Sequence, residues 1–158
     1  MREELVIRPY GEADHEELFA AYAAVVDEGG AFPREPPATE SMLREAWLDK
    51  AHIVRVAELG GRFAGSYTLK ANFPGLAAGI ANAGYLVPRE LRRRGIGRAL
   101  GEHSLEDARS LGYTAMMFNL VLERNPSRPL WESLGFETIG RIPNAVPGEA
   151  AFLYWRSL

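Results

Sequence analysis

The chain has no cysteine, and its 158 residues include only three histidines, His15, His52 and His103, which are widely separated. The lack of cysteine excludes disulfides, cysteine-ligated zinc and a thiol nucleophile. Metal sites in proteins use histidine and cysteine more readily than isolated surface groups. We therefore expect no metal in this protein.

Long apolar runs and an excess of basic residues are also missing. No 18 consecutive residues are apolar, and the first residues, MREELVIRPY, lack the apolar stretch of a signal peptide. The expected location is the cytoplasm, with no membrane partner. The net charge of −3 differs from the basic excess typical of nucleic-acid-binding proteins, so we expect no nucleic-acid partner. The length suits one domain that spans residues 1–158.

Alternating and helical patterns predict an α/β (α+β) domain. Strands are expected at 4–10, 52–59, 62–70, 81–87, 114–122, 137–142 and 149–155, and helices at 12–30, 39–50, 97–112 and 126–135. Residues 31–38 carry three prolines and are interpreted as a loop that could form a lid, and 143–148 as another loop. The order β-α-α-β-β-β-α-β-α-β-β predicts one mixed sheet of about seven strands with four helices. Residues 81–122 form its parallel β-α-β crossover.

The segment LRRRGIGRALG, residues 91–101, lies at the turn from strand to helix in that crossover. A helix start offers unpaired N–H groups, and glycines let an anion approach the backbone closely. The P-loop pattern is absent, and Gly95, Gly97 and Gly101 do not fit the dinucleotide fingerprint. Because the chain as a whole is acidic, the arginines around these glycines favour a small anionic ligand over a long polyanion. A basic helix start with packing glycines is the alternative interpretation.

The pattern Arg92-x-x-Gly95-x-Gly97 resembles the (Arg/Gln)-x-x-Gly-x-(Gly/Ala) signature of the GCN5-related N-acetyltransferase (GNAT) superfamily. The segment NPSRPLWESLGF, 125–136, resembles the C-terminal motif of the same superfamily, with Trp131 at its usual tyrosine position. The order of strands and helices agrees over nearly the whole chain. The resemblance implies the GNAT fold, in which two central parallel strands splay apart, here 81–87 and 114–122.

This resemblance also implies the residues that bind acetyl-CoA, the acetyl donor. The loop would hold the pyrophosphate, the strand end would pair with the pantetheine arm, and an N–H near Leu86 would polarise the thioester carbonyl. By this resemblance, Leu86 would be a catalytic residue, and Tyr85 is added as a catalytic candidate because its hydroxyl could donate a proton. The implied donor-binding residues are Leu86, Val87, Arg92, Arg93, Arg94, Gly95, Ile96, Gly97, Arg98, Asn125, Arg128 and Trp131.

The groups that move protons are less evident in the sequence. Glu28, Glu35 and Glu123 are candidates for the general base, with ordered water as the alternative. Trp131 cannot replace the family tyrosine as the proton donor to the leaving thiolate, because an indole N–H is a very weak acid. Tyr85 and Tyr154 are the candidate replacements, and unaided departure of the thiolate is the third option.

Two asparagines stand inside apolar strands, Asn82 and Asn119, where this residue is disfavoured. Each amide either is satisfied within the splayed sheet or lines the substrate pocket. Residues 118–145 resemble a subgroup that includes a yeast acetyltransferase of azetidine-2-carboxylate, a proline analogue. This resemblance implies that Asn82 and Asn119 contact the substrate carboxyl and that Tyr85 packs on the substrate. Residues 31–47 resemble phosphinothricin-type acetyltransferases, so the expected acceptor is a small amino-acid-like amine.

Other functions remain open at this stage. They are acetylation of a protein N-terminus or lysine, a CoA-binding sensor without activity, and nucleic-acid binding through the arginines. Exposed edge strands and the apolar end FLYW favour a homodimer.

Overall fold

The computed structural model describes residues 2–158, which form a seven-stranded mixed sheet in the order β1-β2-β3-β4-β5-β7-β6. All pairs of neighbouring strands are antiparallel except β4 and β5, which are parallel. The strands are β1 (Leu5–Pro9), β2 (Ile53–Leu59), β3 (Arg62–Ala71), β4 (Ile80–Leu86), β5 (Ala115–Leu122), β6 (Glu137–Val146) and β7 (Glu149–Ser157).

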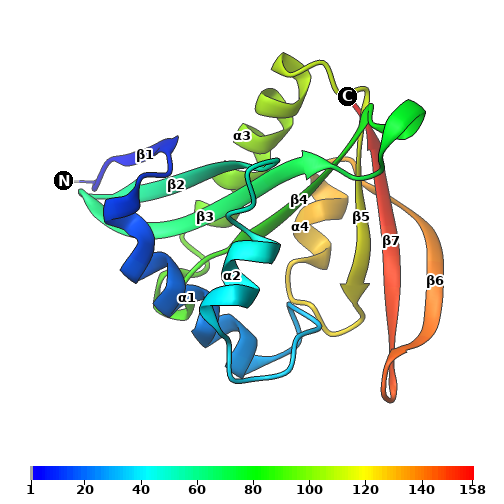
Figure 1. Ribbon diagram of the computed structural model, residues 1–158, viewed down its shortest axis with the longest axis horizontal. Helices are drawn as coiled ribbons and strands as arrows, with labels where there is room; N and C mark the ends of the chain where they lie inside the picture. Colours follow the sequence, from blue (N-terminus) through cyan, green and yellow to red (C-terminus); the bar gives the residue numbers. More distant parts are fainter. Residues whose placement is uncertain (1) are drawn as a thin grey trace.

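Four α-helices cover the two faces of this sheet. They are α1 (His15–Glu28), α2 (Glu40–Ala46), α3 (Ile96–Ser110) and α4 (Arg128–Ser133). Helices α1 and α2 lie on one face, and α3 and α4 lie on the other (Figure 1). The expected order of elements and the α/β class are confirmed. Within residues 2–158, no helix has the length and apolar character needed to cross a membrane.

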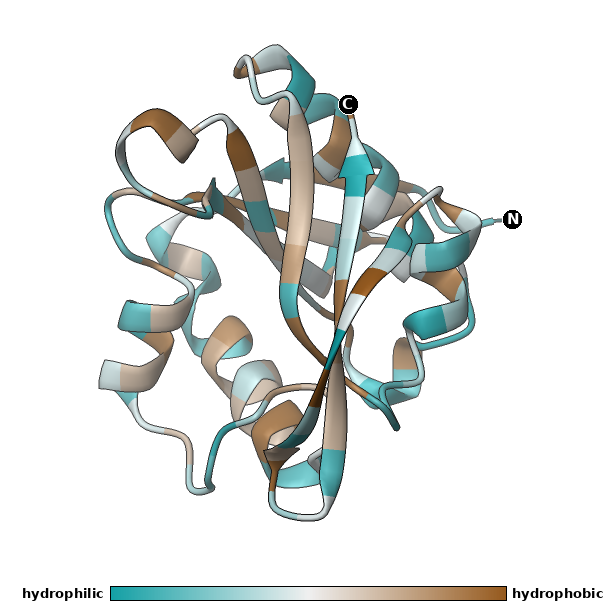
Figure 2. Ribbon diagram, turned by 90° about the vertical axis from the view of Figure 1, so that its right-hand side faces the viewer, coloured by the Kyte–Doolittle hydropathy of each residue, from teal (hydrophilic) through white to brown (hydrophobic). Residues whose placement is uncertain are grey.

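The apolar residues form one core on each face of the sheet. Figure 2 shows apolar residues, in brown, recurring along the strands and on the helices. The core under α3 and α4 includes Tyr67, Leu100 and Trp131, and the core under α1 and α2 includes Leu18 and Trp47. Helix α2 begins where expected, because the Thr39 hydroxyl accepts a hydrogen bond from the main-chain N–H of Met42 at 3.1 Å.

Two boundaries differ from the expectation. Helix α2 ends at Ala46, four residues early. The predicted loop at 143–148 is wrong, since β6 continues to Val146 and only Pro147 and Gly148 form the turn. Pro143 is tolerated in β6 because β6 is an edge strand and its register with β7 shifts between Ile142 and Val146. Three short 3-10 helices, Glu12–Asp14, Gly75–Ala77 and Arg89–Leu91, were not predicted.

The central parallel strands separate soon after they meet. Only two residue pairs join β4 to β5, Ile80 with Ala115 and Ala81 with Met116. Beyond them, the Asn82 side-chain amide donates to the main-chain oxygen of Met117 at 3.0 Å. This amide spans the point where the main-chain ladder stops, so the expected splayed sheet is confirmed.

Candidate active site

A cavity of about 310 Å³ lies in the gap between β4 and β5. Its walls combine residues of both strands, the loop after α1, and the start of α4. None of its lining residues has an ionisable side chain except Tyr85. The lining residues are Ala31, Phe32, Pro33, Asn82, Ala83, Gly84, Tyr85, Phe118, Asn119, Leu120, Val121, Asn125, Ser127 and Trp131.

The glycine-arginine turn leads from the end of β4 into α3. Arg93 and Gly95 both have positive φ, 61° and 84°. Left-handed residues in a turn make successive N–H groups converge into an anion-binding concavity. The first hydrogen bond inside the helix runs from the N–H of Ala99 to Gly95 O, at 3.0 Å. The N–H groups of residues 96–98 therefore have no partner within the helix. Together these groups form a cradle for an anion.

The glycines of this segment have different tasks. A Cβ added to Gly95 would meet no atom within 4 Å, so its left-handed φ is what requires glycine there. A Cβ on Gly101 would lie 2.8 Å from Leu134 Cδ1, so this glycine lets α3 approach α4 closely. Gly97 faces Leu130 at 3.6 Å, an ordinary contact. The packing interpretation therefore applies to Gly101, and the anion cradle depends on Gly95.

Three of the four arginines in this segment are held by other groups. Arg92 donates to Val87 O at 3.0 Å and pairs with Glu28 at 2.6 Å, which fixes the turn to β4 and α1. Arg94 pairs with Glu3 at 3.1 Å, and Arg98 donates to the Ser133 hydroxyl at 2.9 Å.

Arg93 is exposed, and it has no hydrogen bond or ion pair within residues 2–158. It is therefore the arginine of this turn that is most available to a ligand.

Main-chain groups of β4 alternate between its two neighbours. Ile80 O accepts from the N–H of Asn72 at 2.8 Å on the β3 side. Gly79 O accepts from the N–H of Thr114 at 2.9 Å on the β5 side. The register between β4 and β3 is unbroken, so even-numbered residues of β4 face β3 and odd-numbered residues face the gap.

Leu86 is therefore turned away from the gap. A Cβ placed on Gly65 of β3 would lie 2.9 Å from Leu86 O, which puts the main chain of Leu86 against β3. This contradicts the expected polarising role of the Leu86 N–H. By this alternation, the main-chain N–H and C=O groups of Tyr85 face the gap, and β4 ends at Leu86, before Val87. A strand-like donor arm in the gap would pair with these odd-numbered groups.

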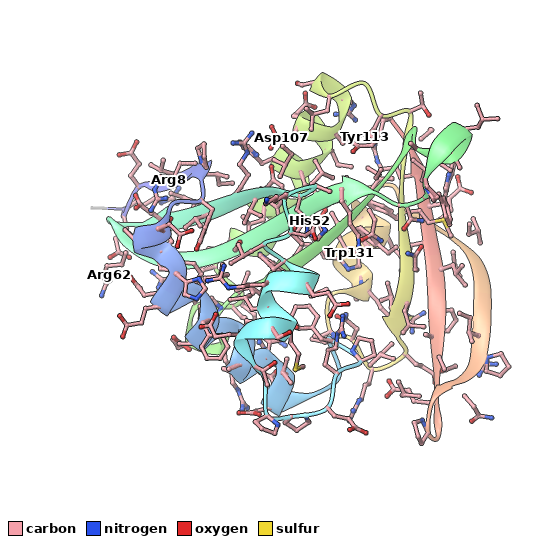
Figure 3. The ribbon with its side chains drawn as sticks, viewed as in Figure 1. Arg8, His52, Arg62, Asp107, Tyr113 and Trp131 are labelled. Carbon is pink, nitrogen blue, oxygen red and sulfur yellow. The ribbon has the colours of Figure 1, made fainter. Side chains whose placement is uncertain are left out.

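Helix α4 and the turn before it bring Trp131 and Asn125 to the cavity. Asn125 Oδ1 accepts from Ser127 N at 2.8 Å, so the side chain shapes the start of α4 while it also lines the cavity. Trp131, labelled in Figure 3, packs against two aromatic rings. Its ring centroid lies 4.6 Å from that of Tyr85 and 5.1 Å from that of Phe118. Trp131 is a wall of the cavity and supplies no acidic proton.

Arg128, also expected to bind the donor, is engaged elsewhere. It donates to the Tyr154 hydroxyl at 3.0 Å and to Glu123 O at 3.2 Å, and it lies 4.0 Å from the centre of the Phe152 ring. These contacts place Arg128 against β7 and outside the cavity lining.

Neither candidate tyrosine is placed as a proton donor. Ser104 gives its single proton to Gly101 O, so it accepts from the Tyr85 hydroxyl at 2.6 Å. Burial raises the pKa of Tyr85, which further disfavours proton release. Tyr154 is fully buried, lies outside the cavity lining and donates to Glu132.

The candidate bases are also absent from the cavity lining. The hydrogen bond from Arg92 lowers the pKa of Glu28 and makes this carboxylate a poor base. Glu35 and Glu123 are exposed and do not line the cavity. Among the interpretations given above, ordered water therefore fits the cavity best.

The two strand asparagines both line the cavity, and each side-chain amide is also satisfied within the sheet, so both interpretations apply. Asn119 forms a reciprocal amide pair with Asn72, at 2.9 and 2.6 Å. Sequence reasoning missed Asn72, because it stands at the edge of a loop where asparagine is unremarkable. The register of β5 with β7 shifts after Phe118, and this bulge re-aims Asn119.

Comparisons with known proteins agree with this geometry. The profile of the Acetyltransferase (GNAT) family matches residues 14–136. The N-acetyltransferase aca1 of Schizosaccharomyces pombe is 40% identical over 82 residues, which are 51% of this chain and 39% of aca1. The chain thus matches well under half of that curated relative.

Two solved structures have the same fold. A GCN5-related N-acetyltransferase from Kribbella flavida is 30% identical, covers 98% of both chains and superposes with a TM-score of 0.91. The acetyltransferase yncA from Salmonella typhimurium, solved with acetyl-CoA, is 20% identical over 98% of this chain and 94% of its own, with a TM-score of 0.85. The chain belongs to the GNAT acetyltransferase family.

The residues present fit acetyl-CoA, the donor of this family. The cradle at Arg93 and Gly95 suits a pyrophosphate, and the open edge of β4 suits an extended amide-bearing arm. Within residues 2–158, no three histidine, aspartate or glutamate side chains cluster as metal ligands would.

Proposed function

We propose that this protein transfers the acetyl group of acetyl-CoA to the amine of a small amino-acid-like acceptor. The observation that carries the proposal is the cavity between β4 and β5, which is covered by a loop and lined by amide and apolar groups. Three asparagines in one small cavity provide both hydrogen-bond donors and acceptors without a net charge.

The donor side would be held mostly by main-chain groups. The N–H groups of residues 95–98 would bind the pyrophosphate, with Arg93 adding charge. The main chain of Tyr85 would pair with the arm, and Asn125 would donate its amide to it. Acetyl-CoA supplies the acetyl group, so the acceptor nitrogen forms a C–N bond while the C–S bond breaks, and thiol and one proton are released.

The loop after α1 limits the size of the acceptor. Ala31 to Pro33 line the cavity, and the Phe32 ring packs against the rings of Tyr22 and Trp47, with centroids 5.6 and 5.8 Å away. A Cβ on Gly30 would lie 3.4 Å from Arg124 Nε, so this loop meets the segment after β5. A loop held at both points forms one wall of the cavity and restricts the space beside it, which favours a small acceptor over a peptide.

The neutral lining of the cavity also bears on the charge of the acceptor and on the path of the proton. No carboxylate lines the cavity, so a polyamine would lose hydration without gaining an ion pair. Water would carry the proton from the amine. The thiolate can leave unaided, because a thiol pKa of about 8.5 makes it a stable leaving group. The main contribution of the protein would be to hold amine and thioester together.

A thermal-shift titration with acetyl-CoA, CoA, ATP and NAD tests donor binding. Ligands that bind only the folded state raise the melting temperature, and we expect this for acetyl-CoA and CoA alone. The absence of any shift would contradict the assignment of the cradle.

A thiol-release assay then tests the acceptor. It compares free amino acids, spermidine and short peptides with free N-termini or lysines, and we expect turnover with amino acids only. Preferred turnover of a peptide would show a protein acetyltransferase. Binding of CoA without turnover of any amine would show a CoA-binding sensor.

A further inference from the structure

A row of polar side chains crosses the sheet face under α1 and α2 and ends at the cavity. Lys70 of β3 is the register partner of Asn82 of β4, which lines the cavity. His52 directly precedes β2, whose first residue, Ile53, pairs with Leu69, so His52 lies opposite Lys70. His52 is near the middle of the sheet in Figure 3.

The direction of this row follows from the neighbouring contacts. A Cβ on Gly84 would lie 3.3 Å from the Trp47 ring, so Gly84 and Asn82, two residues apart, face α2. Thr68 donates to Trp47 O at 2.9 Å and thus faces the same way. Lys70 follows two residues later, so it shares this face. Directly opposite residues have Cβ atoms about 5 Å apart, which brings the Lys70 stem beside Asn82.

Lys70 is a cation without a carboxylate partner. It is one of two lysines in the sequence, beside sixteen arginines. It is half-buried, and no salt bridge within residues 2–158 includes it. Its charge helps lower the pKa of His52, after the larger effect of burial.

Lys70 is a neighbour of the lining residue Asn82 and does not itself line the cavity, and none of the lining residues supplies a positive charge. The lining is neutral, and the nearest arginines of the cradle serve the donor side. A charge beside a neutral, partly enclosed cavity acts on a ligand more strongly than the same charge in bulk water. Lysine fits this place, because its flexible stem lets the ammonium reach past Asn82.

We propose that Lys70 selects acceptors that carry an anionic group beside their amine, by placing its ammonium at the Asn82 end of the cavity. This inference rests on the proposed function and specifies its substrate class as a zwitterionic amine. Asn82 would hold the same group by hydrogen bonding, whereas Lys70 provides the charge. In the described residues, no other unpaired cation lies in this row.

The experiment compares matched acceptors that differ only in charge. L-proline, L-alanine and L-methionine are each tested against their carboxamides with wild type and with Lys70→Gln. For the amino acids, we expect kcat/KM to fall about tenfold or more in Lys70→Gln, mainly through KM. For the carboxamides, the change should stay within about threefold.

Two further variants separate charge from structure. Lys70→Arg keeps the charge and should stay within about threefold of wild type. Lys50→Gln removes the other lysine, which lines a second cavity of about 290 Å³ with Arg44 and His52, and should change neither acceptor class. Thermal melting with and without acetyl-CoA verifies that each variant folds and binds the donor.

An equal decrease of kcat/KM for amino acids and carboxamides would overturn the proposal, because Lys70 would then not distinguish acceptors by their charge. An equal effect of Lys50→Gln would also overturn it. If the wild type prefers the carboxamides, the zwitterionic class is wrong while acetyl transfer to small amines stands. If the wild type acetylates none of the six compounds, the proposed function itself fails, before any variant is compared.

Discussion

The donor side and the acceptor side that we propose for the cavity are built from different kinds of groups. The donor side is a main-chain structure, made by a turn with two positive φ angles and by the open edge of β4. The acceptor side is a side-chain structure, where Asn82, Asn119 and Lys70 come from three strands and the covering loop follows α1.

This difference explains how each side can change. A main-chain cradle requires only that a few positions accept unusual φ, so most side chains around it serve other contacts, as those of Arg92, Arg94 and Arg98 do. The acceptor side has no such constraint. Its specificity depends on which side chains stand at these positions, so substitutions there can change the acceptor while the turn of the donor side is kept.

The largest effect is expected for Gly95→Val on the donor side, which should strongly weaken donor binding but leave the acceptor side unchanged. A β-branched residue at φ 84° is strained by about 1–2 kcal/mol, so the turn rearranges and its N–H groups no longer converge. We expect CoA affinity to fall about a hundredfold, measured by calorimetry.

Gly112→Val is the matched control, because Gly112 has φ 87° and equally open space at the other end of α3. The melting temperature should decrease by a similar amount in both variants, about 2–8 °C. If Gly112→Val weakens CoA binding as much as Gly95→Val does, the loss comes from helix stability and not from the cradle.

The second prediction concerns the acceptor side. Asn82→Ala removes the amide that bonds Met117 O and faces the cavity. We expect kcat/KM for the amino-acid acceptor to fall about tenfold, while the affinity for CoA stays within about twofold. Steady-state kinetics and calorimetry on the same preparation measure both. A parallel loss of CoA affinity would show that the two sides are not separable.

Much of the donor side could be predicted from the sequence, because a local motif encodes it. The spacing of Arg92, Gly95 and Gly97 identified the turn, and the order of elements placed it between the splayed strands. The orientation of Leu86 could not be obtained this way. It depends on the register between β4 and β3, and a shift of one residue would exchange the two sides.

The acceptor side was predictable only as residue types in unusual places. Asn82 and Asn119 stood out as amides in apolar strands, and both line the cavity. Asn72 and Lys70 did not stand out, since polar residues near a strand end are ordinary. Their importance arises from pairing across strands that lie far apart in sequence, and this register is decided by the whole sheet.

The smallest expected effect is on the pH dependence of stability, which reports the charge near His52 in the row from His52 to Asn82. Burial, and to a lesser degree Lys70, lower the pKa of His52 in the folded protein. The unfolded chain therefore binds more protons below its ordinary histidine pKa of about 6.5, so stability falls as pH decreases through that value towards the folded pKa.

Melting temperatures between pH 7.5 and pH 5 should thus fall less in His52→Asn than in wild type, by a few degrees at most. Asparagine keeps a donor for Trp47 O, the partner of His52 Nδ1 at 3.1 Å, so the pH dependence can change without loss of that bond. Lys70→Gln should remove a smaller part of the same dependence, because it deletes only the electrostatic share. An unaltered pH profile in Lys70→Gln, beside a reduced one in His52→Asn, would place the ammonium away from His52. It would also weaken the case that one row of charge and amides extends from β2 to the acceptor.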